Sequence, residues 1–134
     1  MKISSEQAQN EVINFLQLHD IETDFDKMNK QDADDLRDMI AAIAKPISAG
    51  HALIDGNKYT LTLRKPQGDL ISVTVNGLSA ADMFASDKAK NNSEMSKTGQ
   101  IIASMIKIPF AQVGKLTAQD FMLLSKISTL FIVV

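Results

Sequence analysis

A change in hydrophobic spacing in the middle of the chain constrains the fold more than any other feature of the sequence. Residues 58–64 and 70–75 alternate apolar and polar side chains, which is typical of β-strands with one buried face, and a short apolar run at 52–54 precedes them. Two turn sequences separate the runs: Asp55-Gly56-Asn57, where Gly56 or Asn57 can take a positive φ, and Pro66-Gln67-Gly68-Asp69. The sequence therefore predicts a three-stranded antiparallel meander whose apolar face is formed by Tyr59, Leu61, Leu63, Ile71, Val73 and Val75.

The segments before this sheet have the spacing of amphipathic helices. A first helix is predicted over about 6–18, capped by one of the serines before it. A polar loop follows, and a second helix is predicted over 30–45, with Asn29 as its cap and Pro46 as the residue that ends it.

Helical spacing returns after the sheet. A short capped helix is predicted over 79–84, followed by a mobile polar loop over 85–96. A longer helix is predicted over 97–107 and is ended by Pro109. The last helix has the clearest start, because Thr117 is a good cap and an acid follows three residues later.

These elements predict an α+β fold with two parts: an acidic helical segment, residues 1–46, and a unit over residues 47–134 whose C-terminal helices pack on the meander. Residues 1–45 hold ten acidic and five basic side chains, a net charge of −5, whereas residues 46–134 hold six and nine, a net charge of +3. The acidic surface is either a solvated helix face, or a surface that docks on a basic partner or folds back on the chain's own body.

The chain offers few groups for catalysis. It has no cysteine and only two histidines, His19 and His51, neither of which lies in the sequence context of a nucleophile elbow. The aspartates of residues 32–38 lie on a predicted helix and lack the glycine and final glutamate of a calcium-binding loop. The six glycines are dispersed and form no phosphate-binding pattern. We therefore expect a protein that is not an enzyme and that uses no cofactor or metal.

Composition narrows the classes of partner. A net charge of −2 and an isoelectric point near 5.6 argue against nucleic-acid binding. No apolar run reaches the ~20 residues of a membrane span. The first residues lack the apolar region of a secretory signal. We expect a soluble protein that works in a reducing compartment and binds another protein.

Seven methionines and an apolar C-terminal segment are the remaining unusual features. Flexible thioethers fill irregular cores, and they also make adaptable surfaces for varied partners. The last predicted helix is apolar to its end, and its candidate residues for binding a client or a second copy are Phe121, Leu123, Ile127, Leu130, Phe131 and Val134. The alternative is that this helix closes the core over the apolar face of the sheet.

Several short motifs within residues 51–131 occur in the same order as in a known protein family. Leu63-Arg64-Lys65-Pro66 and the following Gly68-Asp69-Leu70 are similar to a "leucine, arginine, x, proline" strand and turn with an acidic-leucine step. A helix then leads to Ile108-Pro109, and Leu116-Thr117-Ala118-Gln119-Asp120-Phe121 is similar to the opening of a last helix that carries a late aromatic, here Phe131. With these motifs the chain resembles the phage tail assembly chaperones of Mu-like and related tailed phages. The motif positions are Leu63, Arg64, Pro66, Asp69, Pro109, Leu116 and Asp120.

The resemblance implies a non-enzymatic protein that acts in the host bacterial cytoplasm and is absent from the mature virion. Members of the family bind the long, largely helical tape measure protein and keep it soluble until tail tube subunits polymerise around it. In many of these phages a frameshift makes a longer form, through which the tail tube protein becomes a second candidate partner, and homo-oligomers are expected. Two alternatives remain: a secretion-type chaperone for an effector client, and a minor structural protein of the tail or baseplate.

Overall fold

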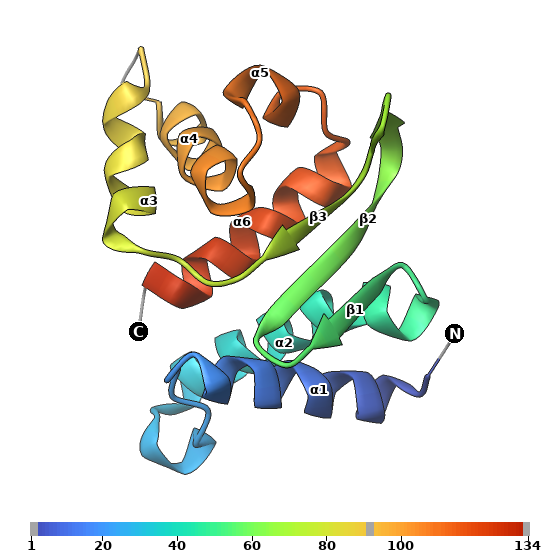
Figure 1. The fold of residues 1–134 in the computed structure, drawn as a ribbon. Coiled ribbons are helices and arrows are strands. Elements are labelled where there is room, and N and C mark those ends of the chain that lie inside the picture. Colours follow the sequence, from blue (N-terminus) through green and yellow to red (C-terminus); the bar gives the residue numbers. More distant parts are fainter. Residues whose placement is uncertain (1–2, 91–92, 133–134) are drawn as a thin grey trace.

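The structure is a computed structural model that describes residues 3–90 and 93–132. It confirms the predicted α+β fold, with helices before and after a three-stranded antiparallel sheet (Figure 1). In chain order the α-helices, 3₁₀ helices (η) and strands are α1 (Ser5–Leu18), η1 (Phe25–Lys27), α2 (Lys30–Ala49), β1 (Ala52–Asp55), β2 (Lys58–Gln67), β3 (Leu70–Val75), α3 (Ala80–Phe84), η2 (Ala85–Lys88), α4 (Glu94–Ile106), α5 (Phe110–Val113) and α6 (Ala118–Ile132).

The sheet has the order β1-β2-β3, and its first turn follows the prediction, because Gly56 takes a positive φ of 62°. The predicted apolar face is buried at Tyr59, Leu61, Leu63, Val73 and Val75. Ile71 contradicts the prediction, since 59% of it is exposed. The register of β2 against β3 shifts between Thr62 and Gln67, so the regular alternation does not extend to this end of β3.

Pro66 lies inside β2 and not in the second turn, where the sequence placed it. The turn consists of Gly68, with a φ of 61°, and Asp69, and Gln67 closes it by pairing with the first residue of β3. Proline has no N–H for the ladder of a sheet, so it is tolerated where pairing is interrupted. The register shift that begins after Thr62 is such an interruption, and it lets β2 continue beyond its predicted end.

Both N-terminal helices begin as predicted, since the side chains of Ser4 and Asn29 accept hydrogen bonds from backbone N–H groups in the first turns of α1 and α2. The predicted end of α2 is wrong. The helix continues through Pro46 and is capped by Gly50, which has a φ of 86°. Proline costs the helix one backbone hydrogen bond, but the additional turn buries Ile47 in the core. The helix therefore crosses the predicted boundary between the two parts of the chain.

The predicted loop over residues 85–96 is wrong in part. η2 occupies its beginning, and α4 starts within it, with the Ser93 hydroxyl accepting a hydrogen bond from the first turn; residues 91 and 92 lie outside the described residues. α4 ends at Ile106, close to the predicted end, but Pro109 is not the residue that ends it. Lys107 adopts a left-handed φ of 61° and ends the helix, and Pro109 instead precedes α5.

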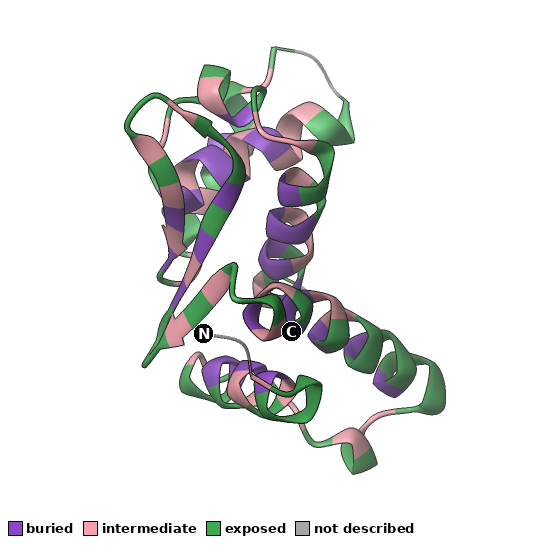
Figure 2. Ribbon diagram, turned by 90° about the vertical axis from the view of Figure 1, so that its right-hand side faces the viewer, coloured by how far each residue is buried: buried purple, intermediate pink, exposed green. Residues whose placement is uncertain are grey.

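One hydrophobic core joins the N-terminal helices, the sheet and the C-terminal helices. Figure 2 shows buried residues along the strands and on the helix surfaces turned toward them. The largest fully buried side chains come from all three parts: Phe15, Leu16, Ile43, Tyr59, Ile102, Leu124 and Ile127. The acidic segment therefore folds back on the chain's own body, which is one of the alternatives that its charge left open.

Tyr59 connects the sheet with α2 inside this core. Its hydroxyl donates a hydrogen bond to the carbonyl oxygen of Ile43 at 2.9 Å. Burial, and then the negative charge of Asp120, raise the pKa of Tyr59 well above its ordinary value of 10.0, so the side chain stays protonated and keeps this hydrogen bond.

Candidate interaction surfaces

Two residues of the family-like motifs, far apart in the sequence, meet in the structure. One carboxylate oxygen of Asp120 accepts a hydrogen bond from the backbone N–H of Arg64 at 2.8 Å, and the other lies 3.7 Å from the Arg64 Nε. Arg64 lies where the pairing of β2 with β3 is interrupted, so its N–H bonds to a carboxylate in place of a strand carbonyl. This contact fastens the start of α6 to the sheet.

The burial of the two partners shows that this contact is structural. Asp120 is 2% exposed, whereas 61% of the Arg64 side chain is exposed. Thr117 is the cap of α6 as predicted, because its hydroxyl accepts from the N–H of Asp120 at 3.2 Å. The carboxylate, however, contacts β2 and not its own helix. Its negative charge is stabilised by the N-terminal turn of α6 and by the Arg64 guanidinium.

The other motif positions are dispersed over the molecule. Leu63 is buried in the core and Leu116 packs against it. Pro66 near the end of β2, Asp69 in the second turn and Pro109 before α5 are exposed. The motif positions therefore share no common surface, and Arg64 and Asp120 are the two that the structure brings into direct contact.

The candidate client-binding residues of the last helix lie mostly in the core. Leu123, Ile127 and Leu130 are buried, and Phe121 and Phe131 are half-buried and pack against the same core. Val134 lies outside the described residues. This placement favours the alternative stated above, in which the helix closes the core over the sheet.

His19 has a structural environment at the end of α1. Its Nε2 lies 2.8 Å from the carbonyl oxygen of Asn57, and its ring meets those of Phe15 and Phe131 edge to face at 4.8 and 5.0 Å. Gly77, with a φ of 124°, lies against the ring, and a Cβ at that position would be 3.1 Å from it. The His19 ring thus connects α1 with three other parts of the fold: the turn between β1 and β2, the segment that follows β3, and α6.

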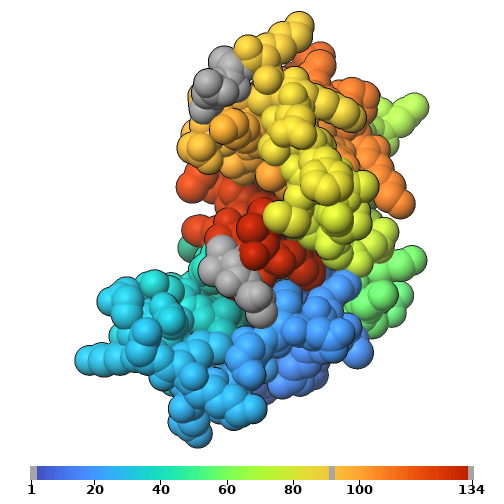
Figure 3. Space-filling view, turned by 90° about the vertical axis from the view of Figure 1, so that its left-hand side faces the viewer, coloured from blue at the N-terminus to red at the C-terminus, as the bar shows by residue number. Residues whose placement is uncertain are grey.

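Exposed apolar side chains gather on the helices that follow the sheet. We call these residues the α3–α5 face: Met83, Phe84, Met95 and Phe110. Phe84 and Met95 are 69% and 64% exposed. Both α3 and α5 pack on α4, and Figure 3 shows α3 and α4 together on this side of the molecule.

The ring of Phe110 lies over a glycine of α4. A Cβ on Gly99 would be 2.8 Å from this ring, so only glycine leaves room for it. Met95 precedes Gly99 by one helical turn and therefore lies on the same side of α4. Of the methionines, Met105 fills the core, whereas Met83 and Met95 are exposed. The two phenylalanines of this face carry no signal in the sequence that separates them from core residues.

A polar contact holds α3 in place on α4. Asp82 completes a capping box with Ser79, and its second carboxylate oxygen accepts a hydrogen bond from the hydroxyl of Ser104. Burial acts to raise the pKa of Asp82, but these hydrogen bonds and the charge of Lys107 outweigh it and lower the pKa below its ordinary value of 3.8. These polar contacts fix α3 on α4 independently of the exposed side chains of Met83 and Phe84.

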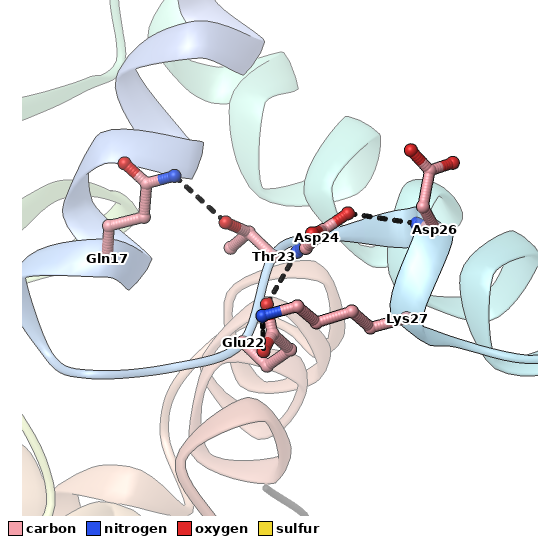
Figure 4. Close-up of polar contacts among 6 residues, drawn as sticks. All are labelled: Gln17, Glu22, Thr23, Asp24, Asp26 and Lys27. Atoms are coloured by element: carbon pink, nitrogen blue, oxygen red, sulfur yellow. Dashed lines mark hydrogen bonds and ion pairs between the residues drawn. The ribbon is translucent and has the colours of Figure 1, made fainter.

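The acidic connection between α1 and α2 forms a polar hollow whose side chains cap its own backbone. Gln17 donates to the hydroxyl of Thr23 at 3.0 Å, and the N–H groups of Asp24 and Asp26 donate to the preceding carboxylates (Figure 4). Lys27 lies 4.0 Å from Glu22. Within residues 3–90 and 93–132, no three acidic or histidine side chains are placed to hold a metal ion.

The face of the sheet opposite the core carries a groove of about 490 Å³. Its floor is formed by Thr60, Thr62 and Ser72, and Leu53 and Ile71 border it. The lining is completed by Ile3 before α1, Glu11 in the middle of α1 and Ile47 in the last turn of α2, together with Gly50, His51 and Ala52 before and in β1.

No protein family, curated protein or solved structure matches this chain. Among the described helices, none has the length and apolar character needed to cross a membrane.

Proposed function

We propose that this protein is a non-enzymatic phage tail assembly chaperone that binds the tape measure protein and keeps it soluble during tail morphogenesis. The single observation that carries the proposal is the ordered series of motifs in residues 51–131 that resembles this family. The contact between Arg64 and Asp120 supports it, since two of the motifs meet at one point of the fold. Under this proposal the protein acts in the host bacterial cytoplasm and leaves before the virion is complete.

The surface that we assign to the client is the α3–α5 face and not the last helix. A tape measure protein exposes apolar stripes along its helices until tail tube subunits cover them. A chaperone for it needs apolar groups that are accessible and adaptable, and exposed methionine and phenylalanine side chains have both properties. Leu123, Ile127 and Leu130 are buried, so they are not accessible without unfolding α6.

The proposal is tested by co-expressing the chain with the long helical reading frame encoded next to it and measuring the fraction of that product that remains soluble. Phe84→Lys and Met95→Lys should each lower the soluble fraction severalfold, because a charge on the α3–α5 face opposes apolar contact. Leu18→Lys is the matched control, since Leu18 is 60% exposed but belongs to α1. If both variants are folded and keep the client as soluble as the wild type does, this face is not the binding surface.

A second measurement separates the alternatives. A chaperone should be absent from purified mature particles, whereas a minor tail or baseplate protein should copurify with them in a fixed ratio. A neighbouring reading frame for a secreted effector, and capture of that effector in place of a tape measure protein, would transfer the proposal to a secretion-type chaperone.

A further inference from the structure

We propose that Asn76 is a site of spontaneous deamidation, in which the backbone nitrogen of Gly77 attacks the Asn76 side chain and His19 acts as the base. Asn76 and Gly77 begin the connection that leads from β3 to α3 (Figure 1). Val75 is fully buried before this pair and Leu78 packs on the core after it, whereas Asn76 itself is exposed. The side chain of Asn76 is therefore accessible to water at a point where the backbone is anchored on both sides.

An asparagine followed by glycine meets little steric hindrance to this reaction. Glycine has no Cβ, so the chain can fold back and bring the nitrogen of Gly77 to the Cγ of Asn76. Gly77 already has a φ of 124°, a conformation that other residues disfavour. Within the described part of the chain, no hydrogen bond uses the N–H of Gly77 or the side chain of Asn76. Neither reacting group therefore has to break a bond of the fold before it reacts.

The ring of His19 lies against Gly77 with one nitrogen in the state that a base requires. Its Nε2 lies 2.8 Å from the carbonyl oxygen of Asn57, and a carbonyl oxygen only accepts hydrogen bonds, so Nε2 carries the proton. In the neutral ring Nδ1 then has the free lone pair. A Cβ on Gly77 would be 3.2 Å from this Nδ1. The fold thus places an unprotonated imidazole nitrogen beside the residue whose N–H must lose its proton.

The reaction consumes water and releases ammonia. The nitrogen of Gly77 bonds to the Cγ of Asn76 and gives its proton to Nδ1 of His19. The bond between Cγ and the side-chain nitrogen of Asn76 then breaks, and this nitrogen takes the proton from Nδ1 and leaves as ammonia. Water opens the resulting cyclic imide at either of its two carbonyls, which leaves an aspartate or an isoaspartate at position 76.

The isoaspartate product alters a junction of the fold. It inserts the side-chain methylene into the main chain between β3 and α3, which displaces Gly77 from the ring of His19. This ring also contacts Phe15 of α1 and Phe131 of α6. We therefore expect the isoaspartate form to unfold at a lower urea concentration than the unmodified chain.

The experiment incubates the folded full chain at neutral pH over days and follows the release of ammonia, with mass spectrometry of digested samples to locate the converted asparagine. Asn76 should convert at least about tenfold faster than Asn57, which precedes a lysine, and than Asn29, whose side chain caps α2. Asn76→Gln should remove the fast release of ammonia. Fast release that persists in this variant overturns the proposal, and so does conversion of Asn57 or Asn29 ahead of Asn76.

A second pair of variants tests the role of His19 as the base. His19→Gln should slow the conversion of Asn76 at least about tenfold, because general-base catalysis contributes about a hundredfold or more. His51→Gln is the matched control and should leave the rate unchanged, since His51 is exposed and lies before β1. Loss of packing at His19 would by itself make the backbone more flexible and speed the attack, so slower conversion cannot result from a loosened fold.

The urea-unfolded chain supplies the final control. Unfolding removes the ring of His19 from Gly77, so His19→Gln and the wild type should then convert at the same rate. A folded His19→Gln variant that converts Asn76 as fast as the wild type, or faster, overturns the proposal.

Discussion

Replacing Asp120 with alanine should destabilise the fold far more than replacing Arg64 with alanine. The first change leaves the backbone N–H of Arg64 without the acceptor that it has at 2.8 Å, and an unsatisfied buried donor costs about 1–3 kcal/mol. It also removes a carboxylate from the first turn of α6, which contributes about 0.3–1 kcal/mol. We therefore expect Asp120→Ala to lower the free energy of unfolding by about 1–4 kcal/mol.

Arg64→Ala keeps the backbone N–H and removes only an exposed side chain 3.7 Å from the carboxylate, so it should cost under about 1 kcal/mol. Asp120→Asn keeps an acceptor oxygen and should fall between the two alanine variants. Urea unfolding followed by circular dichroism measures these differences, and the melting temperature of Asp120→Ala should fall by roughly 10 °C.

The double variant decides between the backbone bond and the ion pair. If the backbone hydrogen bond is the main interaction, Asp120→Ala combined with Arg64→Ala should be about as unstable as Asp120→Ala alone. Equal losses for the two single alanine variants would refute the reasoning, because they would mean that the two side chains hold the sheet and α6 together. A loss under about 0.5 kcal/mol for Asp120→Ala would show that water satisfies the N–H of Arg64 as well as the carboxylate does.

Three further predictions concern pH and backbone conformation. Because burial, and then the charge of Asp120, raise the pKa of Tyr59, the stability that it confers is complete below its ordinary pKa of 10.0 and is lost as the pH rises above that value. Phenolate absorbance of this single tyrosine should therefore appear together with unfolding, and ionisation of the folded protein near pH 10 would contradict the prediction. Burial acts to raise the pKa of Asp82 but is outweighed by hydrogen bonds and a nearby positive charge, so its contribution is present at neutral pH and is lost as the pH falls below 3.8. Asp82→Asn should flatten the acid side of the stability curve, and an unchanged acid side would show that this carboxylate is not stabilising. Gly77→Ala should cost about 1–3 kcal/mol in urea unfolding, because alanine disfavours a φ of 124° and its Cβ would lie 3.1 Å from the ring of His19. Adding His19→Ala should remove only the steric part of this loss, so a complete rescue would argue against backbone strain.

The local signals in the sequence identified most of the elements. Alternation located β2 and β3, a short apolar run located β1, Gly56 supplied the first turn, and Asn29 and Thr117 were recognised as helix caps. Each of these depends on neighbouring residues in the chain, since strand alternation, turn conformation and capping are interactions over a few positions. The α+β class follows from the same patterns.

The errors share a different cause. Pro46 does not end α2, because the turn after it buries Ile47 in a core that the rest of the chain completes. Ile71 is exposed although it follows the alternation, because the register of β2 changes opposite it. Neither the length of α2 nor the exposure of Ile71 is set by the adjacent residues alone. A local sequence pattern therefore cannot predict either of them.

The same distinction applies to the surfaces. The sequence of an apolar C-terminal helix fits a client-binding face and the last layer of a core equally well. Its packing against α2 and α4 in the common core decided for the second. The exposed large apolar residues include those of the α3–α5 face, Leu53 and Ile71 on the sheet, Leu18 on α1, and Met122 and Ile132 on α6. The sequence by itself determined the periods, turns and caps, because these are set by short-range interactions. Which apolar stripe became the interior, and how Asp120 came to bond to Arg64, were decided by the tertiary structure, because burial depends on segments that are distant along the chain.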